Sequence, residues 1–166
     1  IGVVGCGKEG QNIARIAAFH GLEVVFLEIS EASINEAYEC ISGELDNRIE
    51  SWGLTDNEKK IILSRITGTL EYKDLGDCEF VIEAVRRDVY TGERTIDHRK
   101  KIFKNIENVV TPECIIATNA TTLIITELSS ELEYKDRCVS LHFFMSSPEA
   151  RIVEVVRGLY TSEKVY

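Results

Sequence analysis

An α/β fold with a doubly wound, mostly parallel sheet is predicted by three features of this 166-residue sequence. Apolar runs typical of buried parallel strands recur along the chain, and segments of helical periodicity separate them. The first run leads directly into glycines spaced Gly5-x-Gly7-x-x-Gly10, and residues 11–19 continue with apolar side chains at helical spacing. This order of strand, glycine turn and helix is that of a Rossmann-type unit. We therefore expect residues 1–166 to form one Rossmann-type domain, with a helical hairpin inserted at about residues 31–66.

The glycine spacing matches the requirements of a dinucleotide-binding turn. Gly5 is expected to make the tight turn, Gly7 to let the backbone approach a pyrophosphate, and Gly10 to let the helix pack closely on the strand. Lys8 and Glu9 lie between the last two glycines, at the helix N-terminus whose free N–H groups attract phosphate. We expect these five residues to contact the cofactor.

An acidic residue ends the second predicted strand. Residues 23–27 are strand-like, and Glu28 follows them near the ~20-residue offset at which a carboxylate binds the ribose hydroxyls. The alternative to a dinucleotide site is a glycine-rich turn in a purely structural βαβ unit. The dinucleotide site is favoured because strand, glycines, helix, second strand and terminal acid all follow in the required order. A carboxylate at this position would repel a 2′-phosphate, so NAD rather than NADP is the expected cofactor.

The bulk composition excludes several classes of protein. Hydrophobic residues make up 44% of the chain, enough for a core, and the net charge of −9 does not suggest a nucleic-acid or membrane-surface partner. No apolar run is long enough to cross a bilayer, and no signal peptide is recognisable. The five cysteines form no CxxC or Cys/His cluster, which indicates no metal site and a reducing, cytoplasmic compartment. Because the chain starts without Met inside a strand, we expect an excised fragment or missing first residues.

Two amphipathic helices are predicted between the second and third strands. Residues 34–49 carry apolar side chains every three or four positions behind an N-cap at Ser30, and Gly53 of Trp52-Gly53 is expected in the C′ position. Thr55 and Glu58 have the spacing of a capping box ahead of the second helix. Two interpretations of the hairpin stay open: a decorated crossover, or a platform for part of a bulky substrate.

The remaining strands are expected at residues 66–70, 78–85, 114–118, 138–144 and 151–156. Doubly wound sheets bind ligands at the carboxyl ends of their strands, so residues 84–88, beginning with Ala84, should face the cofactor. Small polar residues at 119–122 follow the next strand on the same side. Residues 86–104 form a basic island. A solvated helix face is the favoured interpretation, and an anion site for cofactor or substrate phosphates is the alternative.

A histidine inside an apolar strand and a glutamate on the next strand are the candidates for acid–base chemistry. Two strands joined by a short connection can place His142 and Glu154 opposite each other. In such a pair the carboxylate orients the imidazole and stabilises its protonated form, and oxidation of an alcohol by NAD needs such a general base. A core histidine with satisfied hydrogen bonds is the alternative.

Five motifs along the chain together resemble those of a known protein family. The motifs are Gly5-Cys6-Gly7-Lys8-Glu9-Gly10, residues 78–85, residues 117–123, Leu141-His142-Phe143-Phe144 and residues 152–158. Together they resemble the NAD-binding domain of the L-3-hydroxyacyl-CoA dehydrogenase family. The resemblance covers nearly the whole chain, and the ordered set is far more specific than the glycine turn alone.

The resemblance implies an activity and residue roles. It implies NAD-dependent interconversion of a 3-hydroxyacyl-CoA and a 3-ketoacyl-CoA, with an acyl-CoA-type small molecule as substrate. By the resemblance, His142 is the general base and Glu154 its partner. Thr121 would hold the reacting oxygen, and Asn119 would lie near the nicotinamide ribose. The helical hairpin would contact CoA.

Some positions depart from the family pattern. Met145 replaces an Asn after His-Phe-Phe, and Arg86-Arg87-Asp88 replaces Val-Glu-Asn after the fourth strand. Arg87 is expected beside the nicotinamide end of the cofactor, where it reverses a charge. Two other functions therefore stay open: a dinucleotide-binding module without dehydrogenase activity, and a dehydrogenase of a hydroxy acid not linked to CoA.

The family also has a helical C-terminal domain that dimerises and closes the substrate cleft. This chain stops before that domain, so a homodimer is expected for the full-length protein. The isolated chain is expected to fold and bind NAD without appreciable turnover, because catalysis needs near-attack geometry and exclusion of water.

Glu28 leads to a testable preference between cofactors. NAD(H) should bind more tightly than NADP(H), because the carboxylate accepts hydrogen bonds from ribose hydroxyls and repels a 2′-phosphate. Calorimetric titration of both cofactors measures the difference. Equal affinities, or tighter binding of NADP through Arg86-Arg87, would refute the role of Glu28.

Overall fold

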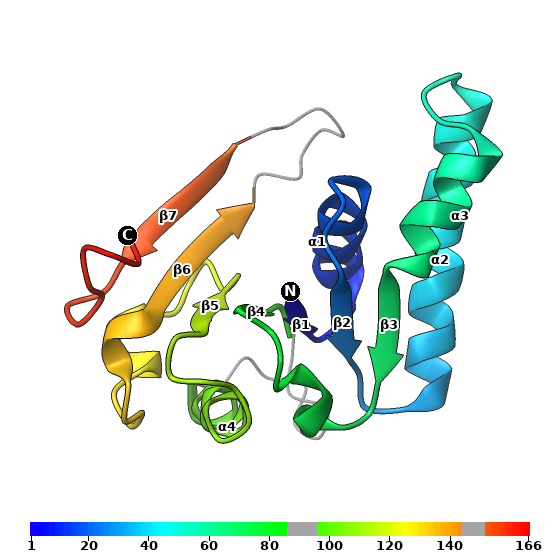
Figure 1. The fold of residues 1–166 in the computed structure, drawn as a ribbon. Coiled ribbons are helices and arrows are strands. Elements are labelled where there is room, and N and C mark those ends of the chain that lie inside the picture. The colour runs from blue at the N-terminus through cyan, green and yellow to red at the C-terminus, as the bar shows by residue number, and fades with distance from the viewer. Residues whose placement is uncertain (86–95, 144–151) are drawn as a thin grey trace.

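The computed structural model of the protein describes residues 1–85, 96–143 and 152–166. Its seven-stranded sheet has the order β3-β2-β1-β4-β5-β6-β7, in which β7 alone is antiparallel to its neighbour (Figure 1). The described strands are β1 (Gly2–Val4), β2 (Val24–Leu27), β3 (Ile66–Thr69), β4 (Phe80–Glu83), β5 (Ile115–Thr118), β6 (Cys138–Phe143) and β7 (Val153–Arg157). The predicted doubly wound, mostly parallel α/β sheet is confirmed.

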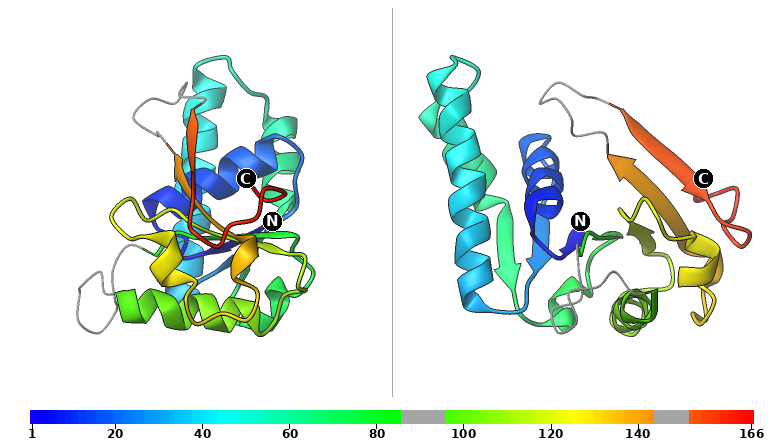
Figure 2. Two further views of the ribbon diagram at one scale, coloured as in Figure 1. Left: turned by 90° about the vertical axis from the view of Figure 1, so that its left-hand side faces the viewer. Right: turned by 180° about the vertical axis from the view of Figure 1, so that it is seen from behind.

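Helices cover both faces of this sheet. On one face lie α1 (Lys8–Phe19), α2 (Glu31–Glu50) and α3 (Asp56–Ser64), and on the other lies α4 (Ile96–Glu107) (Figures 1 and 2). Shorter elements are α5 (Ile125–Leu128) and the 3₁₀ turns η1 (Tyr72–Leu75) and η2 (Lys135–Arg137). Among the helices in the described ranges, none is long and apolar enough to cross a membrane.

Alternate residues of the central strands contribute to two separate hydrophobic cores. On β1, Val3 packs into the core shared with α1 and α2, whereas Val4 packs into the core shared with α4 and α5. On β4, Ile82 belongs to the first core and Val81 to the second. Because both faces of these strands are buried, the sequence shows continuous apolar runs instead of alternation.

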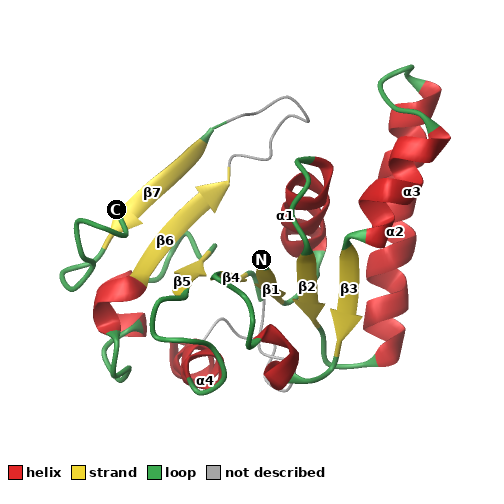
Figure 3. Ribbon diagram, in the orientation of Figure 1, coloured by secondary structure: helices red, strands yellow, loops and turns green. Residues whose placement is uncertain are grey.

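Both helices of the hairpin start where the sequence predicted. Ser30 is the N-cap of α2, and its Oγ accepts a hydrogen bond from the Ser33 N–H at 3.1 Å. At the start of α3, Glu58 accepts from the Thr55 N–H at 2.8 Å, while Thr55 Oγ1 accepts from the Glu58 N–H at 3.3 Å. This is the complete capping box. Figure 3 shows the two helices side by side.

The end of α2 differs from the prediction by one residue. Trp52, not Gly53, takes the left-handed C′ position, with φ of 59°. The Trp52 N–H donates to the Ile49 carbonyl at 3.0 Å and the Gly53 N–H to the Arg48 carbonyl at 2.9 Å, the two bonds of a Schellman motif. The prediction relied on glycine's tolerance of positive φ, but the hydrogen-bond register ends the helix one residue earlier. Trp52 is 97% exposed, so no burial of the indole offsets the strain.

β7 is an exposed edge strand. It pairs with β6 so that Val153 lies opposite Phe143 and Arg157 opposite Val139. Every residue of β7 is exposed, including Val155. The strand predicted at residues 151–156 is present as Val153–Arg157; Ile152 lies before it, and residue 151 is outside the described residues.

Replacing Trp52 by glycine should stabilise the protein by about 1 kcal/mol, because a left-handed conformation costs other L-residues ~1–2 kcal/mol. Urea denaturation followed by circular dichroism measures the free energy of unfolding. Trp52→Ala is the matched control, since it removes the same indole but keeps the Cβ, and it should not stabilise. Equal stabilisation by both variants would show that the exposed indole, not the backbone angle, is the unfavourable feature.

Candidate active site

The glycine turn joins β1 to α1 at the carboxyl edge of the sheet. Gly5 has a left-handed φ of 87°, and its N–H donates to the Leu27 carbonyl at 2.9 Å. A Cβ on Gly10 would lie 2.1 Å from the Gly5 carbonyl oxygen, so the helix can approach the turn only with glycine there. A Cβ on Gly7 would meet no atom within 4 Å. The turn therefore has a tightly packed inner side and an open backbone surface at a helix N-terminus, which suits a phosphate.

The Glu28 carboxylate, at the carboxyl end of β2, lies against this turn. Its Oε1 accepts a hydrogen bond from the Cys6 N–H at 2.5 Å, and its Oε2 accepts from the Ile29 N–H at 3.1 Å. A carboxylate has about four acceptor positions, so capacity for ligand hydroxyls remains. Burial, and secondarily the Glu28 charge, raise the pKa of the Cys6 thiol to about 12. Cys6 is therefore a protonated packing residue and not a nucleophile.

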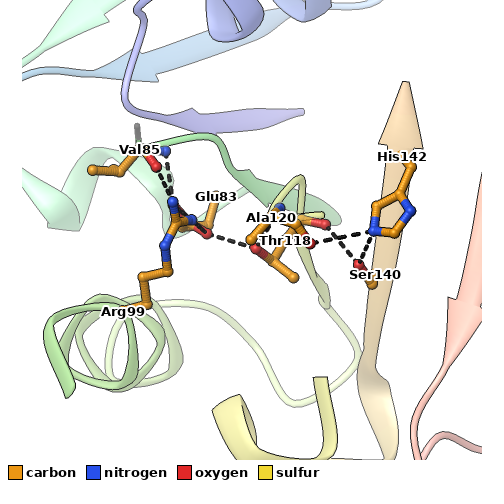
Figure 4. Close-up of polar contacts among 7 residues, drawn as sticks. All are labelled: Glu83, Val85, Arg99, Thr118, Ala120, Ser140 and His142. Carbon is orange, nitrogen blue, oxygen red and sulfur yellow. Dashed lines mark hydrogen bonds and ion pairs between the residues drawn. The ribbon is translucent and has the colours of Figure 1, made fainter. Parts of the chain in front are cut away.

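The antiparallel pairing of β6 and β7 sets His142 directly opposite Glu154. The Nδ1 of His142 lies 2.7 Å from Oε2 of Glu154. The other ring nitrogen, Nε2, lies 3.2 Å from the Ala120 carbonyl oxygen and 3.2 Å from the Ser140 hydroxyl (Figure 4). The imidazole is mostly covered, with 18% of the side chain exposed. The structure thus brings together the two residues that the sequence named as an acid–base pair.

Other predicted site residues follow neighbouring strands at the same edge. Ala84 comes directly after β4, and its N–H donates to the Val4 carbonyl at 2.8 Å. Asn119 comes directly after β5, and its Oδ1 accepts from the Phe143 N–H of β6 at 3.5 Å. Thr121 is exposed and lies one residue beyond Ala120 in the chain. Ala84 and Asn119 therefore lie at the carboxyl ends of β4 and β5, and Asn119 contacts the end of β6. Arg87 and Met145 lie outside the described residues.

Three of the four described arginine and lysine residues of the basic island pair with carboxylates; Lys101 is exposed. Arg99 forms an ion pair with Glu83, Lys100 lies 3.1 Å from Glu131, and Lys104 lies 2.8 Å from Glu107. The favoured interpretation, a solvated helix face, is wrong for Arg99, which is only 6% exposed. Its guanidinium turns inward because a buried carboxylate lies beneath α4.

That carboxylate belongs to a polar network that the sequence analysis missed. Glu83, the last residue of β4, is fully buried. Besides pairing with Arg99, it accepts from the Val85 N–H at 2.7 Å and from the Thr118 hydroxyl at 2.6 Å (Figure 4). Thr118 Oγ1 accepts in turn from the Ala120 N–H at 3.0 Å. An acid inside an otherwise apolar strand was the available signal, but its partner on α4 follows 16 residues later and no spacing rule connects them.

A cavity of about 350 Å³ opens between α1 and α2. Lys8, Gln11 and Arg15 line it from α1, and Glu44 and Asn47 line it from α2. Arg15 is 7% exposed, and its buried Nε has no hydrogen-bond partner among the described residues. Burial, followed by the charge of the nearby Arg48, lowers the pKa of Arg15. The cavity therefore offers two cations, one carboxylate and several amide groups, and the Nε–H of Arg15 is unsatisfied among the described residues.

Comparison with known proteins agrees with this geometry. The family model described as "3-hydroxyacyl-CoA dehydrogenase, NAD binding domain" matches residues 1–166. A 3-hydroxybutyryl-CoA dehydrogenase of Bradyrhizobium diazoefficiens is 30% identical over all of this chain and 54% of its own length. A 3-hydroxyadipyl-CoA dehydrogenase of Escherichia coli is 31% identical over 99% of this chain and 33% of its own length.

The solved structures lead to the same group. The crystal structure of the (S)-3-hydroxybutyryl-CoA dehydrogenase PaaH1 from Ralstonia eutropha has a TM-score of 0.90 and 35% identity, over 99% of this chain and 56% of that chain. The fold, the site and the family model together show that the chain belongs to the 3-hydroxyacyl-CoA dehydrogenase family, as its NAD-binding domain. The chain spans about half the length, 54%, of the Bradyrhizobium relative that it matches.

Arg99→Met should destabilise the fold by roughly 3–5 kcal/mol, because it leaves the Glu83 charge buried without a partner. The double variant Glu83→Gln/Arg99→Met should recover most of that loss, since it also removes the charge. Urea denaturation of the wild type, both single variants and the double variant measures the coupling. Additive losses in the double variant would show that the two side chains are not coupled.

Proposed function

We propose that this chain is the cofactor-binding and acid–base part of an NAD-dependent oxidoreductase that interconverts a 3-hydroxyacyl-CoA and a 3-ketoacyl-CoA. The observation that carries the proposal is the contact of 2.7 Å between His142 and Glu154, located where the strands of a dinucleotide-binding sheet end. Family membership and the names of the relatives support the substrate class.

The dinucleotide would lie along the carboxyl edge of the sheet. The residues present fit it, because the open backbone at Gly7 leaves room for a pyrophosphate and the Glu28 carboxylate lies beside the turn. Lys8 and Glu9 stand at the same helix N-terminus. We assign the nicotinamide end to the neighbourhood of Ala84 and Asn119. NAD, when bound, supplies the acceptor for the hydride from C3 of the substrate.

The chain's own residues would handle the proton. Glu154 accepts the Nδ1–H of His142, which leaves the Nε2 lone pair of the neutral ring able to accept the proton of the substrate hydroxyl. In the oxidation direction the substrate hydroxyl gives its proton to Nε2, and the Glu154 carboxylate stabilises the imidazolium that forms. Thr121 would donate a hydrogen bond to the same oxygen. In the reduction direction the imidazolium returns the proton.

We assign the CoA part of the substrate to the cavity between α1 and α2. Phosphate groups match the lining, because Lys8 and Arg15 outweigh the single carboxylate of Glu44. The unsatisfied Nε of Arg15 is a donor without a partner among the described residues, as a phosphate site would use. This assignment makes the hairpin a substrate platform rather than only a decorated crossover.

The exposed apolar side chains of β7 support a further domain in the full-length protein. Val153 and Val155 are exposed on one face of the edge strand β7, and Leu159, shortly after it in the chain, is 81% exposed. An apolar surface of this kind is normally covered. We propose that a C-terminal domain covers it, closes the substrate cleft and dimerises, and that the protein acts in the cytoplasm.

The test is oxidation of NADH with acetoacetyl-CoA by the full-length protein. Turnover supports the proposal. NADH binding without turnover would favour the dinucleotide-binding module. Turnover with a free hydroxy acid but not with the CoA ester would favour the dehydrogenase of a substrate not linked to CoA.

His142→Ala should lower the rate by roughly 10²–10⁴-fold, because it removes the general base, while NAD affinity stays near that of the wild type. Glu154→Gln should keep the fold and lose part of that rate, since the imidazolium loses its charged partner. Steady-state kinetics and calorimetric NAD titration of the same preparations separate the two effects. A near-normal rate in His142→Ala would reduce His142 to a core residue.

A further inference from the structure

The side chain of Ser140 lies in a buried position next to the proposed base. It precedes His142 by two residues and so shares its face of β6. Ser140 is 2% exposed. Its Oγ lies 3.2 Å from Nε2 of His142 and donates to the Thr118 carbonyl oxygen at 3.4 Å (Figure 4). The hydroxyl therefore lies between an imidazole nitrogen and a backbone carbonyl.

The partners of His142 differ in what they can do. The Glu154 carboxylate only accepts, so it takes the Nδ1–H. The Ala120 carbonyl also only accepts, so it can bond to Nε2 only when that nitrogen carries a proton. The Ser140 hydroxyl can donate or accept. Among the described contacts of Nε2, the Ser140 hydroxyl is thus the one that can bond to this nitrogen when it carries no proton.

We propose that Ser140 is a positioning residue that holds the His142 ring in one orientation in both of its protonation states, an inference that rests on the proposed role of His142 as general base. With the neutral ring, the hydroxyl donates to the Nε2 lone pair until the substrate hydroxyl takes that place. With the protonated ring, the hydroxyl turns to the Thr118 carbonyl and accepts from Nε2–H together with the Ala120 carbonyl. Only a hydroxyl hydrogen moves between the two arrangements.

The surroundings keep the two acceptors in place. The Thr118 hydroxyl donates to Glu83 and accepts from the Ala120 N–H, so the backbone on both sides of Asn119 is tied to the buried network. Among the described residues, Glu154 of β7 contacts the ring, and Glu83 of β4 hydrogen-bonds to Thr118 and is balanced by Arg99 of α4. Arg157, at the far end of β7 opposite Val139, pairs with Glu163. Ser140 itself is uncharged, so it acts on His142 through hydrogen bonding and not through the electrostatic field of a charge.

Ser140→Ala should shift the pH dependence of the reaction in a definite direction. The neutral ring loses the one described donor to Nε2, whereas the protonated ring loses one of two acceptors at Nε2–H and keeps the Ala120 carbonyl there and the Glu154 carboxylate at Nδ1–H. The ring should therefore hold its proton to higher pH, and the acidic limb of kcat/KM for oxidation should move up by about half a pH unit, the size expected for one hydrogen bond.

The experiment uses the full-length protein with two readouts. One is the pH profile of kcat/KM with NAD and a 3-hydroxyacyl-CoA, which reports the free enzyme. The other is the pH titration of ring-labelled His142 by NMR, assigned with His142→Gln, which needs no turnover. Ser129→Ala is the matched control, because Ser129 is also 2% exposed but donates to the Ile125 carbonyl at 2.9 Å, and it should shift neither readout.

Ser140→Cys is a second variant that tests the same proposal if the alanine variant does not fold. It preserves the side-chain shape with a weaker hydrogen-bonding group, so it should shift both readouts in the same direction. An upward shift of the His142 titration in either folded variant supports the inference, and an unchanged titration and pH profile in an active protein overturns it. A shifted titration in a protein that oxidises no hydroxyacyl-CoA would support Ser140 and refute the proposed function.

Discussion

The burial of one carboxylate, Glu83, is the constraint on which the site end of the sheet depends. Removing a carboxylate from water is costly unless charge and hydrogen bonds replace the water. Here the replacements come from Arg99 on α4, Thr118 on β5 and the Val85 N–H after β4. Satisfying one side chain therefore fixes a helix, a strand and a loop relative to one another. The same Thr118 then anchors Ala120, whose carbonyl faces His142.

The sheet order separates two kinds of recognition along one edge. At β1 and β2 the surface is made by backbone, with Gly7 open and Glu28 beside it. At β5, β6 and β7 it is made by side chains, centred on His142. The strand between them, β4, ends in Glu83. A dinucleotide lying across this edge, as proposed, would have its ribose hydroxyls at the first region and its reactive ring at the second, which is where doubly wound sheets bind ligands.

What the sequence predicted depended on local chemistry or on strand register. The glycine turn was predictable because its requirements lie within six consecutive residues, and His142 with Glu154 because strands joined by a short connection pair in antiparallel register. The Glu83–Arg99 pair was not, since only packing of α4 on the sheet brings the two together. At the end of α2, the residue type favoured Gly53 for the left-handed position. The helix ends one residue earlier than that, so Trp52 takes this position instead.

The position of Glu154 has a consequence for how the protein would lose activity under stress. β7 is the outermost strand, paired on one side only, and its residues are all exposed. Strands of this kind open at lower free energy than the interior of a sheet. Fraying of β7 would remove the carboxylate from His142 while the glycine turn, on the central strand β1, stays folded. Chemical competence and nucleotide retention would then belong to different cooperative units. Where no further domain covers β7, gentle heating would separate the Glu154 carboxylate from His142 while the glycine turn still holds the dinucleotide.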